Sequence, residues 1–165
     1  AIIPADIDEV PHQRELPRGY SLRMAHEKAL AAVLPDDIKD SALVLAGDTV
    51  VAVGSRILPK AETEDQARAC LALLSGRRHR VYGGIALRLA DGSLRSRSVT
   101  SSVVFKRLHP DEIDAYIATN DWQGKAGGYA IQGPAAAYIR YIDGSYSNIV
   151  GFSLFDVSAL LSAFG

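Results

Sequence analysis

The sequence predicts an α/β fold built around a mixed β-sheet. Runs of β-branched and aliphatic residues bounded by turn residues alternate with segments in which apolar residues recur at helical spacing. Hairpin signals at Gly54-Ser55 and Asp91-Gly92 place antiparallel pairs among the strands. Alternating strands and helices that include such hairpins are typical of an α/β architecture with a mixed sheet.

Composition limits the class of protein. The 165 residues are 48% hydrophobic and 22% charged, as expected for one globular domain over residues 1–165. The net charge of −1, with both signs mixed, gives no electrostatic footprint for a nucleic acid polymer. Cys70 is the one cysteine, which excludes an internal disulfide and a cysteine zinc cluster. We expect Cys70 to be a core residue.

The chain also lacks the features of a membrane protein. No apolar run approaches the roughly 18 residues of a membrane span. No signal peptide precedes the first expected strand, so we expect a cytoplasmic protein. That strand end, within Ile2 to Val10, leads into the acids Asp6 to Glu9, which suit a bound cation or form a solvated turn.

The most unusual stretch is Leu43 to Lys60. Two apolar runs, Leu43 to Ala46 and Val50 to Val53, predict buried strands interrupted by Gly47-Asp48-Thr49. A carboxylate is costly to bury unless hydrogen bonds, a cation or a metal compensates it. Gly47 lets the backbone or a ligand approach Asp48 closely. We therefore interpret Asp48 as the centre of a functional site.

Two helices flank this stretch. The first is predicted over Tyr20 to Leu34, with Ser21 as N-cap. Lys28 lies beside the small residues of its apolar stripe, where its long side chain either reaches a pocket or follows the surface to solvent. The stripe consists of Leu22, Ala25, Ala29, Ala32 and Val33. The second helix starts at a capping box, Thr63 with Gln66, and ends at Gly76.

The remaining elements follow in order. The patterns predict strands over 81–90, 93–108 and 136–142, a helix over 110–119, a polar loop over 145–151 and a closing helix. The apolar stripe of the closing helix is Leu154, Val157, Leu160, Leu161 and Phe164. Between the helix over 110–119 and the strand over 136–142, the segment Trp122 to Gly133 contains four glycines and Lys125, a composition that suits a phosphate or base cradle.

The unusual residues together describe a site for a metal-bound polyphosphate. They are the acids Asp6 to Glu9, Lys28, Asp48, Lys60, the basic cluster Arg77 to Arg80, Lys125 and Gln132. The basic cluster either binds an anion or is a solvated cluster at the end of a helix. Mg²⁺ prefers one or two carboxylates, with water and phosphates completing its octahedron. A further carboxylate positions or deprotonates water, which indicates a hydrolase acting on a phosphoanhydride. The GxxxxGK[ST], GxGxxG and GxSxG motifs are absent.

Several ordered motifs resemble one family. They are Asp8-Glu9, Ala25-His26-Glu27-Lys28-Ala29, Gly47-Asp48-Thr49-Val50-Val51, Ile57-Leu58-Pro59-Lys60, Leu74-Ser75-Gly76 with His79-Arg80-Val81, Gly124 to Gly133, and Gly144 to Gly151. This set is similar to the Maf nucleotide pyrophosphatases, also called septum formation inhibitor proteins. The resemblance implies an inosine-triphosphatase-like fold with an elongated mixed sheet, flanking helices and a cleft between two lobes.

The resemblance also implies a reaction and a set of roles. The reaction is hydrolysis of a nucleoside triphosphate to its monophosphate and pyrophosphate with a divalent metal, Mg²⁺ or Mn²⁺. Asp48 matches the proton acceptor close to the metal, and Glu9 matches a metal-proximal carboxylate. The phosphate-facing positions are Lys28 and Lys60, and Lys125 belongs to the glycine-rich cradle.

By the same resemblance, Thr49 and Gln132 match the positions that determine substrate choice in the family. Their surrounding motifs resemble the subfamily acting on dTTP and UTP. An amide at Gln132 both donates to and accepts from a pyrimidine edge. The alternatives are a 7-methyl-GTP-type pyrophosphatase and a non-catalytic nucleotide-binding regulator of septum formation. A homodimer is a family-level expectation.

Some positions depart from the family pattern. Its members open with a Ser-x-Ser-Pro-Arg-Arg loop on the first strand, and this loop helps to hold the triphosphate. The chain does not contain it, so we expect the 165 residues to lack the N-terminal strand and the phosphate-binding loop. Pro59, Ala61 and Gly83 replace residues that are more common in the family.

Overall fold

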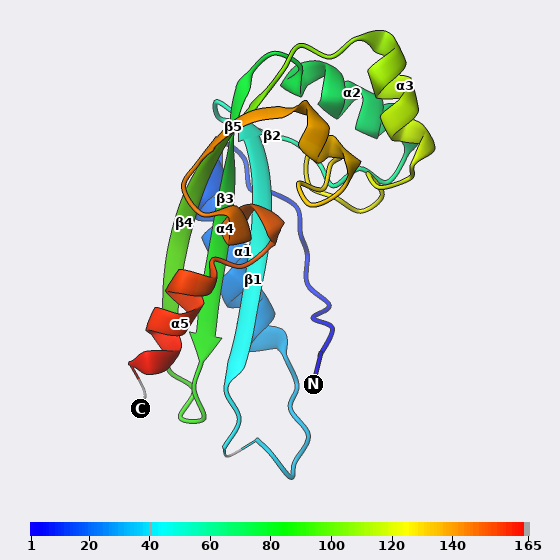
Figure 1. The fold of residues 1–165 in the computed structure, drawn as a ribbon. Helices are drawn as coiled ribbons and strands as arrows, with labels where there is room; N and C mark the ends of the chain where they lie inside the picture. The colour runs from blue at the N-terminus through cyan, green and yellow to red at the C-terminus, as the bar shows by residue number, and fades with distance from the viewer. Residues whose placement is uncertain (40, 164–165) are drawn as a thin grey trace.

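The computed structural model describes residues 1–39 and 41–163. The molecule is elongated, with helices on both faces of a long, twisted sheet and a second group of helices at one end (Figure 1). The helices are α1 (Pro17–Ala31), α2 (Glu64–Leu74), α3 (Pro110–Ala118), the 3₁₀ helix η1 (Pro134–Tyr138), α4 (Tyr146–Val150) and α5 (Leu154–Ser162). The strands are β1 (Val44–Val53), β2 (Arg56–Ile57), β3 (Arg78–Arg88), β4 (Leu94–Phe105) and β5 (Ile139–Asp143).

The α/β class is confirmed, but the sheet is not mixed in the part of the chain that the structure describes. Its order is β2-β1-β3-β4-β5, and each of these neighbours pairs antiparallel. A parallel pair needs a connection that crosses the sheet. Helices α2 and α3 instead lie beyond one end of the sheet, so the chain re-enters at the end that it left (Figure 1).

Strand β1 runs without a break through the position where two separate runs were predicted. Gly47, Asp48 and Thr49 are paired in register with residues 85, 84 and 83 of β3. The prediction of an interruption was therefore wrong, because a polar residue in a strand can point to one face of the sheet while the backbone stays extended. Asp48 is thus held by a central strand and not by a turn.

Helix α1 covers one face of β1, β3 and β4 and starts earlier than predicted. It begins at Pro17, a residue that is pre-organised for the first helical position, and Leu16 is its N-cap. Ser21 is not the N-cap: it is buried inside the helix, and its hydroxyl donates to the Arg18 carbonyl at 3.0 Å. Val33 of the predicted stripe lies outside α1 and is exposed.

Other boundaries also differ. The predicted polar loop contains helix α4, capped by Ser145, whose hydroxyl accepts from the Asn148 N–H. The predicted strand over 136–142 is divided between η1 and β5, and residues 1–10 form no strand. In the closing helix, Leu160 is buried and Leu154 is exposed, while Phe164 lies outside the described residues.

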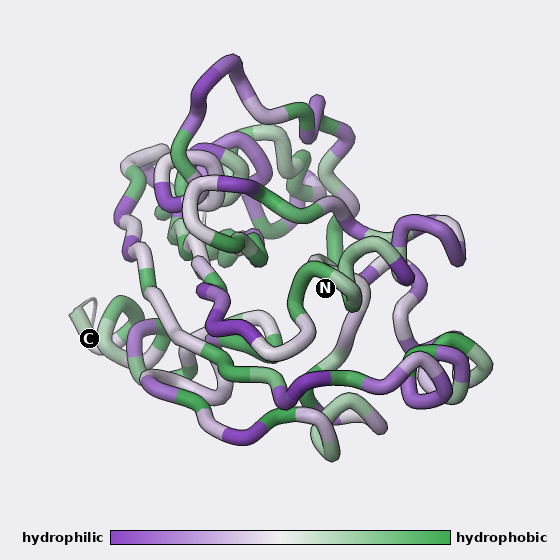
Figure 2. Tube along the Cα trace, turned by 90° about the horizontal axis from the view of Figure 1, so that it is seen from above, coloured by the Kyte–Doolittle hydropathy of each residue, from purple (hydrophilic) through white to green (hydrophobic). Residues whose placement is uncertain are grey.

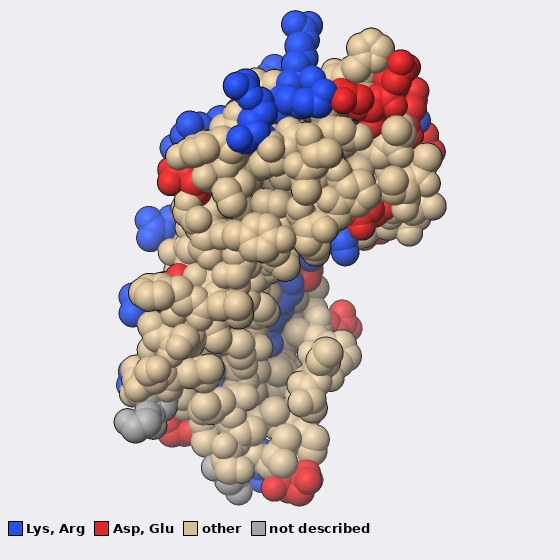
Figure 3. All heavy atoms as spheres, viewed as in Figure 1, with Lys and Arg blue, Asp and Glu red and all other residues tan. Residues whose placement is uncertain are grey.

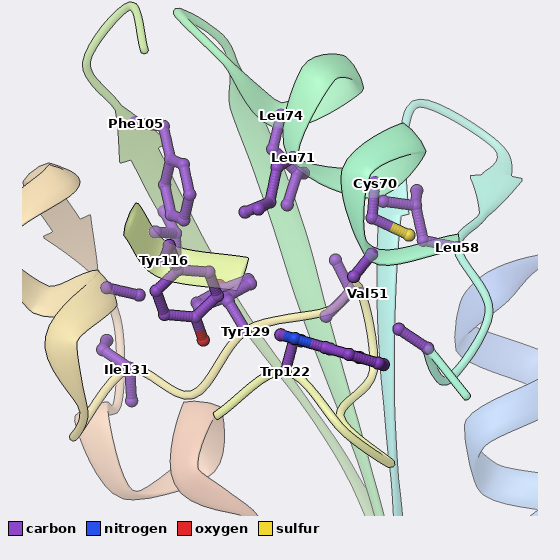
Figure 4. Close-up of a cluster of buried hydrophobic side chains, with 14 of the residues drawn as sticks. Val51, Leu58, Cys70, Leu71, Leu74, Phe105, Tyr116, Trp122, Tyr129 and Ile131 are labelled. Atoms are coloured by element: carbon purple, nitrogen blue, oxygen red, sulfur yellow. The ribbon is translucent and has the colours of Figure 1, made fainter. Parts of the chain in front are cut away.

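The main core lies in what we call the upper lobe, namely α2, α3, residues 120–138 and the adjoining ends of β1, β3 and β4. Figure 4 shows the side chains of these elements converging, with Trp122 and Tyr129 on one side and Leu71 and Leu74 on the other. Cys70 is buried there as predicted, and the predicted capping box at Thr63 and Gln66 is present.

The lower lobe is the rest of the sheet, with α1 on one face and α4 and α5 on the other (Figure 1). Seen from above, hydrophobic and hydrophilic residues alternate along parts of the trace (Figure 2). In β4, this alternation corresponds to a half-exposed strand. Among the described residues, we find no helix with both the length and the apolar character needed to span a bilayer.

The approach of α1 to the sheet generates a first prediction. A Cβ on Gly84, the residue paired with Asp48, would lie 2.0 Å from the Ser21 carbonyl oxygen. Gly84→Ala should therefore displace α1 and lower the free energy of unfolding by at least about 2 kcal/mol, measured in urea. The control is Gly19→Ala in the same helix, where a Cβ meets nothing within 4 Å and no loss is expected. Equal stability of the two variants would contradict this packing.

Candidate active site

A cavity of about 340 Å³ lies where the two lobes meet. Its wall contains residues from α1, β1, the segment after β2, the glycine-rich segment 124–132 and the end of α4. In Figure 3, the surface is hollowed between the upper lobe and the lower part of the molecule, and basic side chains are visible inside the hollow. Six predicted residues line this one cavity: Lys28, Asp48, Thr49, Lys60, Lys125 and Gln132.

Asp48 is the buried carboxylate of the site. Its side chain is 4% exposed, and Lys28 Nζ donates to its Oδ1 at 2.7 Å. Burial raises the pKa of the Asp48 carboxyl, and the neighbouring Lys28 ammonium only partly offsets this effect. Burial also works against the charge on Lys28, but its hydrogen bonds to Asp48 and Glu9 outweigh burial and raise the pKa of the ammonium.

Glu9 connects the two lysines. Its Oε1 lies 2.8 Å from Lys28 Nζ, and its Oε2 lies 2.5 Å from Lys60 Nζ. Partial burial opposes the charge on Glu9, yet the hydrogen bonds from both lysines lower the pKa of its carboxyl. Glu9 lines an adjoining cavity of about 380 Å³, which shares Asp48, Thr49 and Lys60 with the first. Two carboxylates and two ammonium groups are thereby joined in one network.

Lys60 and Lys125 are placed by two segments that pair with each other. Lys60 forms an isolated antiparallel bridge with Ala126. The Ala61 N–H donates to the Lys125 carbonyl at 3.0 Å, and the Gly127 N–H donates to the Pro59 carbonyl at 3.0 Å. Ala61 is fully buried in the upper-lobe core, which explains how a residue less common in the family is accommodated beside Lys60.

Thr49 and Gln132 also line the cavity. The Thr49 hydroxyl donates to the Gly151 carbonyl at 3.4 Å, which ties β1 to the end of α4. The side chains of Gln132 and Lys125 are exposed, and within residues 1–39 and 41–163 neither has a hydrogen bond or ion pair. An unpaired amide and an unpaired ammonium at a cavity wall are free to bind a polar ligand.

Sequence reasoning missed the apolar wall of the cavity. Tyr129, Ile131, Ile149 and Phe152 contribute to it. Phe152 lies over Gly47, where a Cβ would be 2.5 Å from its ring, so the absence of a side chain at Gly47 makes room for this ring. An aromatic residue following the Gly144 to Gly151 motif was the available signal, but the sequence did not indicate that the segment folds back over β1.

A buried polar pair supports this wall. His79 Nε2 and the Tyr129 hydroxyl are 2.6 Å apart, and both rings pack edge to face with Phe105. On the other side, Asn148 anchors α4: its amide donates to the Val81 carbonyl at 3.3 Å and to the Ser101 hydroxyl at 3.1 Å. The wall is therefore held by specific hydrogen bonds as well as by packing.

Two predicted groups lie away from this site. Arg77, Arg78 and Arg80 are exposed near the start of β3 and are absent from the described cavity lining, while His79 between them is buried. Of the two alternatives for this cluster, a role in the cavity was wrong, and the exposed side chains of Arg77, Arg78 and Arg80 fit a solvated cluster. Asp8 accepts from the Val10 N–H at 3.0 Å, so this acid stabilises a local turn.

The sequence is similar to those of known proteins over nearly its whole length. The family model described as "Maf-like protein" matches residues 1–164. A protein of Paramagnetospirillum magneticum named "dTTP/UTP pyrophosphatase" is 59% identical over 98% of this chain and 84% of its own length. Proteins with the same name from Rhodospirillum rubrum and Gluconobacter oxydans are 58% and 54% identical, over 100% and 98% of this chain and 77% and 75% of their own lengths.

The chain belongs to the Maf-like protein family. The resemblance drawn from the ordered motifs is thereby confirmed. Within this Maf-like chain, the motifs around Lys28, Asp48 and Lys60 and the segment Gly124 to Gly133 come together at one cavity. The predicted site residues are thus neighbours in space, although they are far apart in the sequence.

The pair of His79 and Tyr129 generates a second prediction. Burial lowers the pKa of His79 to about 4, whereas the unfolded chain binds this proton near pH 6.5. The unfolded state therefore binds more protons between these values, and stability should fall by up to about 3 kcal/mol as the pH decreases from 6.5 to 4.

Urea unfolding at several pH values measures this loss. His79→Phe should reduce it, since the substitution removes the buried titrating ring, and His79→Gln serves if the first variant does not fold. The control is His12→Gln at an exposed position, which should keep the wild-type dependence. An unchanged pH dependence in a folded His79 variant would contradict the assignment.

Proposed function

We propose that the protein hydrolyses dTTP and UTP to the nucleoside monophosphate and pyrophosphate, with a divalent metal, Mg²⁺ or Mn²⁺. The observation that carries the proposal is the buried carboxylate of Asp48 in a cavity with Lys28, Lys60 and Lys125. Three cations around one carboxylate suit a polyanion that must be brought close to a base. Several relatives are named dTTP/UTP pyrophosphatase, and this name supports the proposed substrate and the proposed reaction.

In the proposed reaction, water attacks the α-phosphorus of the nucleotide. A new bond forms from the water oxygen to this phosphorus, and the bond from the α-phosphorus to the oxygen bridging to the β-phosphorus breaks. Asp48 accepts the proton that water loses, and pyrophosphate leaves with the bonding electron pair.

The lysines stabilise charge on the phosphates. Lys60 and Lys28 contact Glu9, which is 37% exposed as a side chain and can exchange these partners for solvent or metal. Phosphate oxygens of the substrate would take the place of the Glu9 carboxylate on the two ammonium groups. Lys125, at the cavity wall, would add a further charge. Preorganised cations of this kind lower the barrier most where charge develops on the leaving group.

The chemistry of the two acids fits a small divalent cation. Oxygens of Glu9 and Asp48 both lie within 2.8 Å of a single atom, Lys28 Nζ, so they are close enough to share one cation. The described residues contain no cluster of three or more such ligands, and Mg²⁺ needs only one or two carboxylates when substrate phosphates and water supply the rest. Glu9 and Asp48 would hold the metal, which would polarise the phosphates.

The base would lie against the apolar wall, with Gln132 at its edge. Thr49 is already bonded to the Gly151 carbonyl, whereas the amide of Gln132 has both donor and acceptor groups available. A pyrimidine with adjacent carbonyl and N–H groups is complementary to such an amide. We further propose that the protein is a homodimer, which light scattering tests. We also propose that it is cytoplasmic, where a triphosphate pool is available.

Asp48→Asn tests the catalytic role. The amide keeps the size of the side chain but accepts no proton from water, so pyrophosphate release should fall by at least about 100-fold. The assay uses dTTP, UTP, CTP, 7-methyl-GTP and ATP, each with Mg²⁺ or Mn²⁺, and thermal unfolding checks the fold. The control is Asp143→Asn, an exposed carboxylate on β5. An undiminished rate in the folded Asp48 variant would show that this role is wrong.

Gln132→Glu tests base recognition. A carboxylate accepts hydrogen bonds but does not donate them, so one of the two contacts to the pyrimidine edge should be lost. We expect kcat/KM for dTTP and UTP to fall about tenfold or more, with a smaller change for nucleotides that present a donor. The matched control is Gln123→Glu, an exposed residue outside the described cavity lining. An unchanged substrate profile would count against the role of Gln132.

A further inference from the structure

Glu9 is held in place although its own segment has no regular structure. Residues 1–12 form neither helix nor strand, yet the Glu9 carboxylate meets two lysines within 2.8 Å. Ion pairs of a half-exposed side chain are weak, so they do not by themselves fix a loop. The backbone of this segment must therefore be positioned by other contacts, and the structure contains them.

The first contact comes from a buried tyrosine of α1. The Tyr20 hydroxyl donates to the Glu9 carbonyl oxygen at 2.6 Å, and its side chain also lines the adjoining cavity. Its ring packs among Met24, Val50 and Tyr82, which fixes the direction of the hydroxyl. Burial, with the nearby charges of Asp48 and Glu9, raises the pKa of Tyr20, so the hydroxyl remains a donor at neutral pH.

The second contact comes from an arginine one turn further along α1. Arg23 Nη2 donates to the Val10 carbonyl at 3.2 Å, and the guanidinium binds Glu15 through two hydrogen bonds of 2.8 and 2.7 Å. Glu15 in turn accepts from the His12 N–H at 2.8 Å. The bond from Arg23 lowers the pKa of Glu15 to about 2, so this ion pair persists across the physiological range.

We propose that Tyr20 and Arg23 form a clamp that positions Glu9 for the metal and the phosphates. The inference rests on the proposed function. The clamp binds the carbonyl groups of residues 9 and 10 and leaves the Glu9 carboxylate untouched. That carboxylate can therefore exchange lysine for metal while its backbone stays fixed. Tyr20 and Arg23 are positioning residues, since they act on the substrate through Glu9.

Tyr20→Phe removes the hydroxyl and keeps the ring. The matched control is Tyr82→Phe, which removes a hydroxyl from the same buried cluster, where the described residues show no hydrogen bond to it. We expect Tyr20→Phe to weaken Mn²⁺ binding to the complex with a non-hydrolysable α,β-imido analogue of dTTP by about three- to tenfold, the effect of one hydrogen bond. The affinity measured for Tyr82→Phe should stay at the wild-type value.

A double-mutant cycle separates positioning from simple packing. If Tyr20 acts through Glu9, Tyr20→Phe should have an effect below twofold in the Glu9→Gln background, in both Mn²⁺ affinity and kcat/KM. Equal effects in both backgrounds would overturn the clamp and indicate a structural role only. If Tyr20→Phe does not fold, Arg23→Lys replaces it, because lysine keeps the charge and loses the paired contacts.

Failure of the clamp can be told from failure of the proposed function. A wild-type protein that releases no pyrophosphate from any nucleotide overturns the proposed function. An active wild type in which Tyr20→Phe and Tyr82→Phe behave alike overturns the clamp alone. Hydrogen exchange of the amides of residues 9, 10 and 12 gives an independent measure: it should be faster in Tyr20→Phe than in Tyr82→Phe, and equal rates would contradict the clamp.

Discussion

The burial of the Asp48 carboxylate beside the Lys28 ammonium is the constraint on which the arrangement of the lower lobe depends. A charge this deep needs a partner at hydrogen-bonding distance, because burial without compensation costs several kcal/mol. The partner is on α1, so the helix must approach the sheet closely. Small residues make this possible: Ala25 and Ala29 face the sheet from α1, and Gly84 offers no side chain where the helix backbone passes.

The same constraint explains the charge balance of the cavity. Glu9 and Asp48 supply two negative charges, and Lys28 and Lys60 supply two positive ones, so this network is close to neutral within itself, and Lys125 adds one further positive charge at the cavity wall. Lysines without carboxylate partners would attract phosphate strongly, but their ammonium groups would also repel one another. Glu9 and Lys60 are the more exposed members, so the network can open toward a polyphosphate on their side while the pair of Lys28 and Asp48 stays in contact.

The sequence predicted the fold class and the residues that come together at the cavity, but it did not predict the direction of the strands. Lys28, Asp48 and Lys60 were predictable because a charged residue beside an apolar run is costly and needs a reason. The fully antiparallel sheet was not predictable. The direction of a strand depends on where the intervening helix packs, and the local sequence pattern does not encode the position of that helix. Helix α4 was missed because its five residues are too few to show a helical repeat of apolar residues. Tyr20 and Arg23 were missed because they reach residues 9 and 10 through backbone carbonyl groups, which carry no residue-specific signal.

The segment that carries Gln132 and the segment that carries Glu9 are held in different ways, and this difference follows from what each residue is proposed to do. Lys125 and Gln132 belong to a segment packed on the upper-lobe core. In this segment Gly127 and Gly128 take positive φ, and a Cβ at these positions would lie 2.8 Å from Val51 and 3.3 Å from Ala67. A fixed backbone limits the positions that the Gln132 amide can reach, and this favours discrimination between bases. Glu9 has to change partners between lysine and metal. A backbone tied at two carbonyl groups, with a half-exposed carboxylate, allows that exchange without loss of position.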